Sequence, residues 1–230
     1  MPKRDEHSKA AGELKALEQH LCALAEIVES EFAESVMVLM EGDVGAAQEV
    51  RVEDYKAHQA WLQADSVCVD LLASGELGLK EVQFVSAAIK AAMWLKMSAD
   101  ESARISRLMR ECSPNDVGPD GPMETLGEMA TLTQSMLSDG VEAFINRDGG
   151  AAQRLHLVFG ELGSLRRRLV EQVAGKVPSA AKGAGRTFAS LLMVGCSLEA
   201  IGEYVLELAA HTARLYPSAN SSGELKAEAE

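Results

Sequence analysis

The segment Asp43-Val-Gly-Ala-Ala-Gln48 separates two long helical patterns, and it returns as Asp148-Gly-Gly-Ala-Ala-Gln153, 105 residues later. Further along each copy stand Leu95-Lys-Met-Ser-Ala-Asp100 and Leu198-Glu-Ala-Ile-Gly-Glu203, which are offset by 103 residues. Two registers that agree within two residues indicate an internal repeat. We therefore expect the chain to consist of two similar halves.

Around these segments, apolar residues recur at spacings of three and four, which is the period of one helix face. The pattern predicts helices over residues 10–41, 46–73 and 79–112, and again over 123–146, 151–174 and 180–215. Three prolines and two glycines in residues 113–122 cannot continue a helix. The sequence thus predicts an all-α protein of two tandem three-helix bundles, residues 10–112 and 123–216, with a linker over 113–122 and a disordered tail over 217–230.

The composition narrows the classes of partner. Hydrophobic residues make up 47% of the 230 residues but aromatic residues only 4%, which favours helices rich in Ala, Leu, Val and Met. A formal charge of −13 would repel a phosphate backbone, so nucleic acid is not an expected partner. The basic run Arg166-Arg-Arg168 is interpreted first as a solvated helix face and second as a docking patch.

The four cysteines, Cys22, Cys68, Cys112 and Cys196, form no CxxC pair and are expected to be reduced thiols. The N-terminal residues lack the apolar core of a secretory signal, and no uncharged apolar run of about 18 residues is present. We therefore expect a cytoplasmic protein whose membrane association, if any, is peripheral and through partners.

Candidate metal ligands gather late in the last helix. Glu199, Glu203, Glu207 and His211 follow one another at spacings of four, so neighbours share one side of the helix. Carboxylate and imidazole groups suit iron, zinc or manganese, although an acidic stripe on an exposed helix face has the same pattern. Asp100 is the repeat equivalent of Glu203.

The same position in the first half departs from this pattern. Lys96 is the repeat equivalent of Glu199, and a cation beside a carboxylate would compete with a metal for it. Asp54 and His58 form another pair at a spacing of four, which is interpreted as an accessory metal pair or, by default, a hydrogen-bonded surface pair.

No motif supports catalysis. Residues 182–187, KGAGRT, lack the spacing of a phosphate-binding loop, and no strand precedes them. No arrangement of Ser, His and Asp or of an activated Cys is indicated. A di-iron bundle would need Glu-x-x-His pairs on two helices, which the sequence does not offer. The chain is expected not to be an enzyme.

Over residues 10–216 the chain resembles the PhoU family of phosphate-uptake regulators. Its best local match is Ser197-Leu-Glu-Ala-Ile-Gly-Glu203, which is similar to the family segment S-(I/L)-E-R-(I/L)-(G/A)-D, and residues 95–105 form a weaker first copy. Residues 52–58 lie where the family has acidic residues on its second helix. The resemblance implies a cytosolic, often dimeric protein that binds iron or zinc clusters through E/DxxxD motifs. It also implies docking to the phosphate ABC transporter ATPase and to a phosphate-sensing histidine kinase.

Departures from the family concern the metal ligands above all. Lys96 and Trp61 stand where the family has carboxylates, Ala200 replaces an Arg, and only Glu161 remains of an acidic pair on the fifth helix. We therefore expect one weak metal site at most, in the second half. Alternative readings are a divergent accessory protein of another permease or regulator and a carboxylate-bridged metalloprotein, and no docking residues are indicated.

Overall fold

The computed structural model describes residues 3–110, 112, 121–177 and 184–217, and the regular secondary structure of these residues is all helix. The helices are α1 (Lys3–Glu41), α2 (Val44–Ser74), α3 (Leu79–Met109), α5 (Pro122–Asn146), α6 (Ala151–Lys176) and α7 (Gly185–Leu215). The predicted all-α fold is confirmed. Helix α1 begins seven residues earlier than the apolar pattern indicates, and α3 ends three residues earlier. Most of the predicted linker and tail, residues 113–120 and 218–230, lies outside the described residues.

The repeated aspartate shapes the first turn of each half. Asp43 Oδ1 accepts hydrogen bonds from the backbone N–H groups of Gly45 (2.7 Å) and Ala46 (3.3 Å), which caps the exposed start of α2. Asp148 Oδ1 accepts the N–H of Gly150 (2.8 Å) in the equivalent turn before α6. In each half the repeated aspartate therefore accepts a backbone N–H group in the turn that leads into the second helix.

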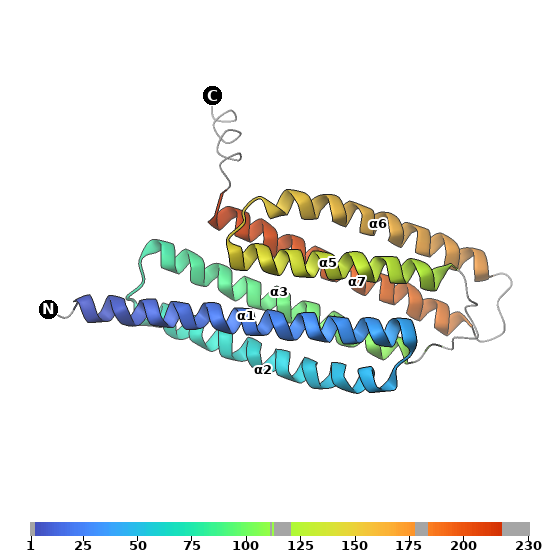
Figure 1. Cartoon of the computed structure of the whole chain (residues 1–230), viewed down its shortest axis with the longest axis horizontal. Helices are drawn as coiled ribbons and strands as arrows, with labels where there is room; N and C mark the ends of the chain where they lie inside the picture. The colour runs from blue at the N-terminus through green and yellow to red at the C-terminus, as the bar shows by residue number, and fades with distance from the viewer. Residues whose placement is uncertain (1–2, 111, 113–120, 178–183, 218–230) are drawn as a thin grey trace, which may run out of the picture.

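Each half is a three-helix bundle, and the two bundles lie side by side. Helices α1, α2 and α3 pack on one another, as do α5, α6 and α7. Helix α3 also packs along α7, and α1 along α5, so these four helices form the middle of the molecule while α2 and α6 lie at its two edges (Figure 1). One continuous cluster of buried side chains draws on all six of these helices.

Helix α7 is the most apolar of the helices. An 18-residue window within it has a mean hydropathy of 1.4, which by length and composition would allow it to cross a bilayer. Half of that window is buried inside the protein, where α7 packs against α3, α5 and α6. Its central place in the core accounts for its apolar composition.

The turn between α2 and α3 gives a simple test of this geometry. Gly75 ends α2 with φ 68°, in the left-handed region that an L side chain disfavours. We expect Gly75→Ala to lower the free energy of unfolding by about 1 kcal/mol, and Gly75→Asn by less, in chemical denaturation. Gly160→Ala, in the exposed interior of α6, is the matched control and should stabilise by about 0.5 to 1 kcal/mol. A loss at both positions would contradict the backbone explanation.

Candidate functional site

The acidic groups of the first half surround a lysine. Lys96 Nζ on α3 lies 3.2 Å from Asp54 Oδ1 on α2, and it also pairs with Asp100 one turn further along α3. The Lys96 side chain is only 13% exposed, whereas those of Asp54 and Asp100 are 40% and 61% exposed. Burial acts to lower the pKa of Lys96, but its hydrogen bonds to Asp100 and Asp54 and their charges outweigh burial and raise it. The ammonium is thus a fixed cation at the α2–α3 contact.

Behind this pair lies a carboxyl group that is not among the predicted site residues. Glu31 on α1 is completely buried, and neither of its carboxyl oxygens has a hydrogen-bond partner among the described residues. Burial, and secondly the charge of Asp54, raise the pKa of Glu31 to about 9, with smaller contributions from Asp100 and Glu53 and against the pull of Lys96. Glu31 therefore carries a proton at neutral pH.

These residues, as placed, do not fit a transition metal. A metal site needs carboxylates that converge on a free position, and here the ammonium of Lys96 takes that position between Asp54 and Asp100. His58, the predicted accessory ligand, is exposed, and its ring lies beside Trp61 at a centroid distance of 5.6 Å. Asp54 thus pairs with Lys96 across the helix contact.

The second half also has an ion pair between its second and third helices, but with the positions of the cation and the carboxylate exchanged. Arg166 Nε on α6 lies 2.6 Å from Glu199 Oε2 on α7, and both side chains are about one-third exposed. In the first half the cation is on α3 and the carboxylate on α2. In the second half the carboxylate is on α7 and the cation on α6. Each half therefore closes its outer helix onto its third helix with one charge pair.

The other predicted ligands on α7 do not gather around Glu199. Glu203 and Glu207 are exposed, and His211 packs edge-on against Trp94 of α3 with its Nε2 atom 3.0 Å from Lys90 Nζ. Burial, then the charges of Lys90 and Arg214, lower the pKa of His211. Among the described residues, no group of three or more His, Cys, Asp or Glu side chains could hold a metal ion. The metal-binding prediction itself stays a prediction.

The basic run on α6 is tied to both neighbouring helices. Arg166 pairs with α7, while Arg168 Nη2 lies 2.5 Å from Glu128 Oε2 on α5 and Arg168 Nε donates to Thr125 Oγ1 at 3.1 Å. Arg167 donates to Ser164 Oγ on its own helix at 3.2 Å. Arg167 and Arg168 are exposed, as predicted, but Arg166 is half-buried. Arg166 and Arg168 thus join α6 to α7 and α5, whereas Arg167 stays on the exposed face of α6.

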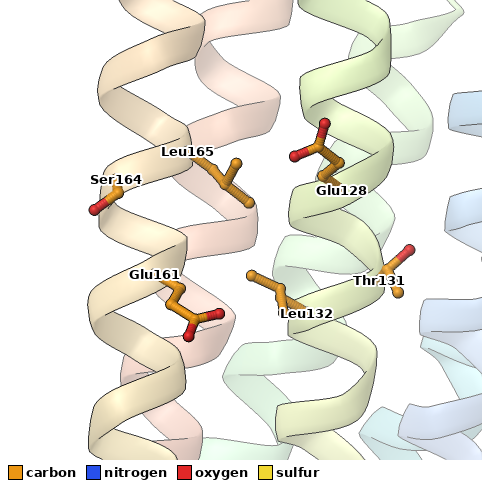
Figure 2. A pocket seen from close by; sticks show the side chains of 6 residues that line it. All are labelled: Glu128, Thr131, Leu132, Glu161, Ser164 and Leu165. Atoms are coloured by element: carbon orange, nitrogen blue, oxygen red, sulfur yellow. The ribbon is translucent and has the colours of Figure 1, made fainter.

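A groove of about 540 Å³ runs between α5 and α6 (Figure 2). Leu132 and Leu165 point toward each other across it, and Glu128 and Glu161 lie along its length, with Thr131 and Ser164 at its edges. Only Glu161 was noted in the sequence. The groove arises from the packing of α5 against α6, and the sequence pattern of neither helix alone predicts it.

Comparisons with known proteins agree with the repeat. The family model described as "PhoU domain" matches twice, at residues 21–109 and 126–212. Two relatives, the phosphate-specific transport system accessory protein PhoU homologues of Pseudomonas putida and Pseudomonas aeruginosa, are 27% and 26% identical over 140 residues, which is 61% of this chain. The aligned part spans 54% and 57% of those relatives, so the chain matches little more than half of their length.

Solved structures match over nearly the whole chain. The crystal structure of PhoU from Pseudomonas aeruginosa has a TM-score of 0.83 at 21% identity and covers 89% of this chain and 97% of that one. The phosphate transport system regulatory protein PhoU from Streptococcus pneumoniae has a TM-score of 0.81 at 20% identity, with coverage of 90% and 97%. At this identity the two structures establish the fold alone.

Proposed function

Because the chain belongs to the PhoU family, we propose that it is a cytoplasmic accessory protein of phosphate transport that regulates by docking and not by catalysis. The observation that carries this proposal is the match of the PhoU domain to both halves of the chain. The names of the relatives point in the same direction, since both are called phosphate-specific transport system accessory proteins. The expected partners are a phosphate transporter ATPase, a phosphate-sensing histidine kinase, or both.

The mechanism we propose depends on shape. A helical scaffold that binds one state of an ATPase or kinase better than another shifts the population between the two states. The two ion pairs support this reading, because Lys96 and Arg166 neutralise Asp54 and Glu199, two of the carboxylates that a metal-dependent mechanism would use. A body of packed helices with charge-paired edges is suited to present a surface to a partner.

The phosphate link is tested by removing the gene in the native host. We expect alkaline phosphatase to rise several-fold in phosphate-rich medium, and the wild-type gene to restore repression. Unchanged phosphatase and unchanged phosphate uptake would favour the second candidate, an accessory protein of another permease or regulator. The departures at Lys96 and Trp61 are the observations that favour that candidate.

The metal question has a separate test in the same strain. Glu203 and Glu207 are exposed, so the double variant Glu203→Gln, Glu207→Gln should fold as the wild type does. We expect it to restore repression fully, because a scaffold does not need these carboxylates as ligands. Loss of repression, together with iron, zinc or manganese found by elemental mass spectrometry in tag-free wild-type protein but not in the variant, would restore the metal prediction.

A further inference from the structure

A pocket of about 330 Å³ opens between α2 and α3 in the first half of the chain. The residues that line it are His58, Trp61, Met93, Lys96, Met97 and Asp100. The indole ring of Trp61 and the two methionine side chains give the pocket apolar walls, and Met93 is 43% exposed. Apolar walls with a few charged groups among them are typical of a pocket that binds a small group.

The pocket carries an excess of negative charge. The ammonium of Lys96 binds two carboxylates, Asp54 and Asp100, and both contacts end on the Oδ1 atoms. Among the described residues, no other side chain donates a hydrogen bond to either carboxylate, so their Oδ2 atoms are open to another donor. One ammonium against two carboxylates leaves one negative charge over, which favours a cationic ligand.

The second half of the chain shows which cation suits this place. Arg166 follows Trp61 by the repeat offset of 105 residues, and its Nε atom lies 2.6 Å from Glu199 Oε2 on α7. The second half thus closes this contact with a guanidinium group of its own. In the first half Trp61 supplies no cation, and the carboxylate of Asp100, whose side chain is 61% exposed, lines an open pocket.

A guanidinium group matches these walls better than an ammonium group does. It is planar and weakly hydrated, so it can stack on an indole ring while its N–H groups bind a carboxylate. The unbranched side chains of Met93 and Met97 can pack around the methylene groups that carry it. The cavity is near the low end of the volumes of ligand pockets, roughly 300 Å³, which suits a single side chain.

We propose that the pocket between α2 and α3 binds an arginine side chain of a partner protein, which stacks on Trp61 and pairs with Asp100. This names the chemistry of the partner in the proposed function, and it rests on that function only in so far as a docking partner exists. The net charge of −13 also attracts a basic docking segment. The arginine of the partner would do in the first half what Arg166 does within the second half.

The indole N–H signals of a nuclear magnetic resonance spectrum report this binding directly, because the chain has two tryptophans and Trp94 is buried. N-acetyl-arginine amide, added to the full chain up to about 50 mM, should shift the Trp61 signal with a dissociation constant on the order of a few millimolar. The Trp94 signal should stay nearly unchanged. N-acetyl-lysine amide should bind about threefold more weakly or less, and the neutral N-acetyl-citrulline amide should cause no saturable shift.

Two variants locate the contact. Asp100→Asn removes the carboxylate and should weaken the binding of N-acetyl-arginine amide about tenfold, because a charge-assisted hydrogen bond is lost. Glu203→Gln, at the repeat equivalent of Asp100, is the matched control and should bind the probe as the wild type does. Both residues are exposed, so the circular dichroism and the melting of the two variants should stay close to wild type.

Several results would overturn the proposal: equal shifts of Trp61 and Trp94, equal responses to the arginine and citrulline amides, or unchanged binding in Asp100→Asn. Free arginine that binds tenfold more tightly than the blocked arginine would identify the free amino acid as the ligand instead. A Trp61 signal that moves with protein concentration alone would identify a second copy of the chain. All of these measurements use purified protein without phosphate or a transport component, so they fail or succeed separately from the alkaline phosphatase test.

Discussion

Glu31→Gln should make the protein more stable at neutral pH, although it removes a charged residue type from the fold. The pKa of Glu31 is about 9 in the folded protein against an ordinary value of 4.5, so the folded state holds a proton there that the unfolded state has lost. Stability linked to this group is fully present below pH 4.5 and is lost as the pH rises toward 9. A Gln side chain does not titrate and so escapes this loss.

The expected size is large. Over the window between the two pKa values, the wild type should lose stability relative to Glu31→Gln by roughly 1 kcal/mol per pH unit, which makes a difference of about 3 kcal/mol between pH 5 and pH 8. Burial is the largest cause of this raised pKa, and the charged groups that contribute are Asp54 and Glu53 on α2 and Lys96 and Asp100 on α3. Urea denaturation at several pH values measures the difference directly.

Two further variants sharpen the test. Glu26→Gln changes an exposed carboxylate on the same helix and should leave the pH dependence of stability as in the wild type. Glu31→Met copies the other half of the chain, where the repeat equivalent, Met136, is completely buried in α5. It should stabilise at pH 7 as Glu31→Gln does, because both replace a titrating group. An unchanged pH slope in both Glu31 variants would show that Glu31 is not buried as the fold places it.

The parts of the fold that the sequence predicted are those that local patterns control. Apolar spacing of three and four sets which residues form helices. Asp43 and Asp148 mark the turns because Asp43 caps α2 and Asp148 accepts the N–H of Gly150 in the turn before α6. The predicted start of α1 is too late because the first seven residues of this helix are all polar or charged. Polar residues can continue a helix, but they give no apolar spacing from which it could be predicted.

The site was harder to predict because its chemistry lies between helices. Spacing along α7 groups Glu199, Glu203, Glu207 and His211 on one side of the helix. Yet the partner of Glu199 is Arg166 on α6, and His211 faces α3. A spacing of four predicts which side chains share a face of one helix. It does not predict which residues of a neighbouring helix they contact, because that depends on how the two helices pack.

Two residues did leave a readable signal. Lys96 stood out because the repeat places it where the other half has Glu199, and the structure shows it between Asp54 and Asp100. Glu31 falls between Val28 and Phe32 on the buried face of α1, so the period of that helix already indicated burial of a carboxyl group. The helical period does not predict that the carboxyl oxygens of Glu31 lack hydrogen-bond partners among the described residues.

Lys96→Gln should destabilise the protein by about 1 to 2 kcal/mol at pH 7 and give the first half an affinity for divalent cations. The loss follows because Asp54 and Asp100 would face each other without a counter-charge, and the partial exposure of the two aspartates keeps the cost below that of a fully buried pair. The gain follows because carboxylates that converge on a position without an ammonium can bind a metal ion there.

Thermal unfolding with and without Mn²⁺ or Zn²⁺ separates the two effects. We expect the melting temperature of Lys96→Gln to fall without metal and to recover when metal is added, while that of the wild type stays unchanged. The triple variant Lys96→Gln, Asp54→Asn, Asp100→Asn removes the carboxylates and should lose the response to metal. If the wild type itself gains stability from metal and loses this gain in Asp54→Asn, the ammonium does not exclude a metal ion. The first half would then be a metal site despite Lys96.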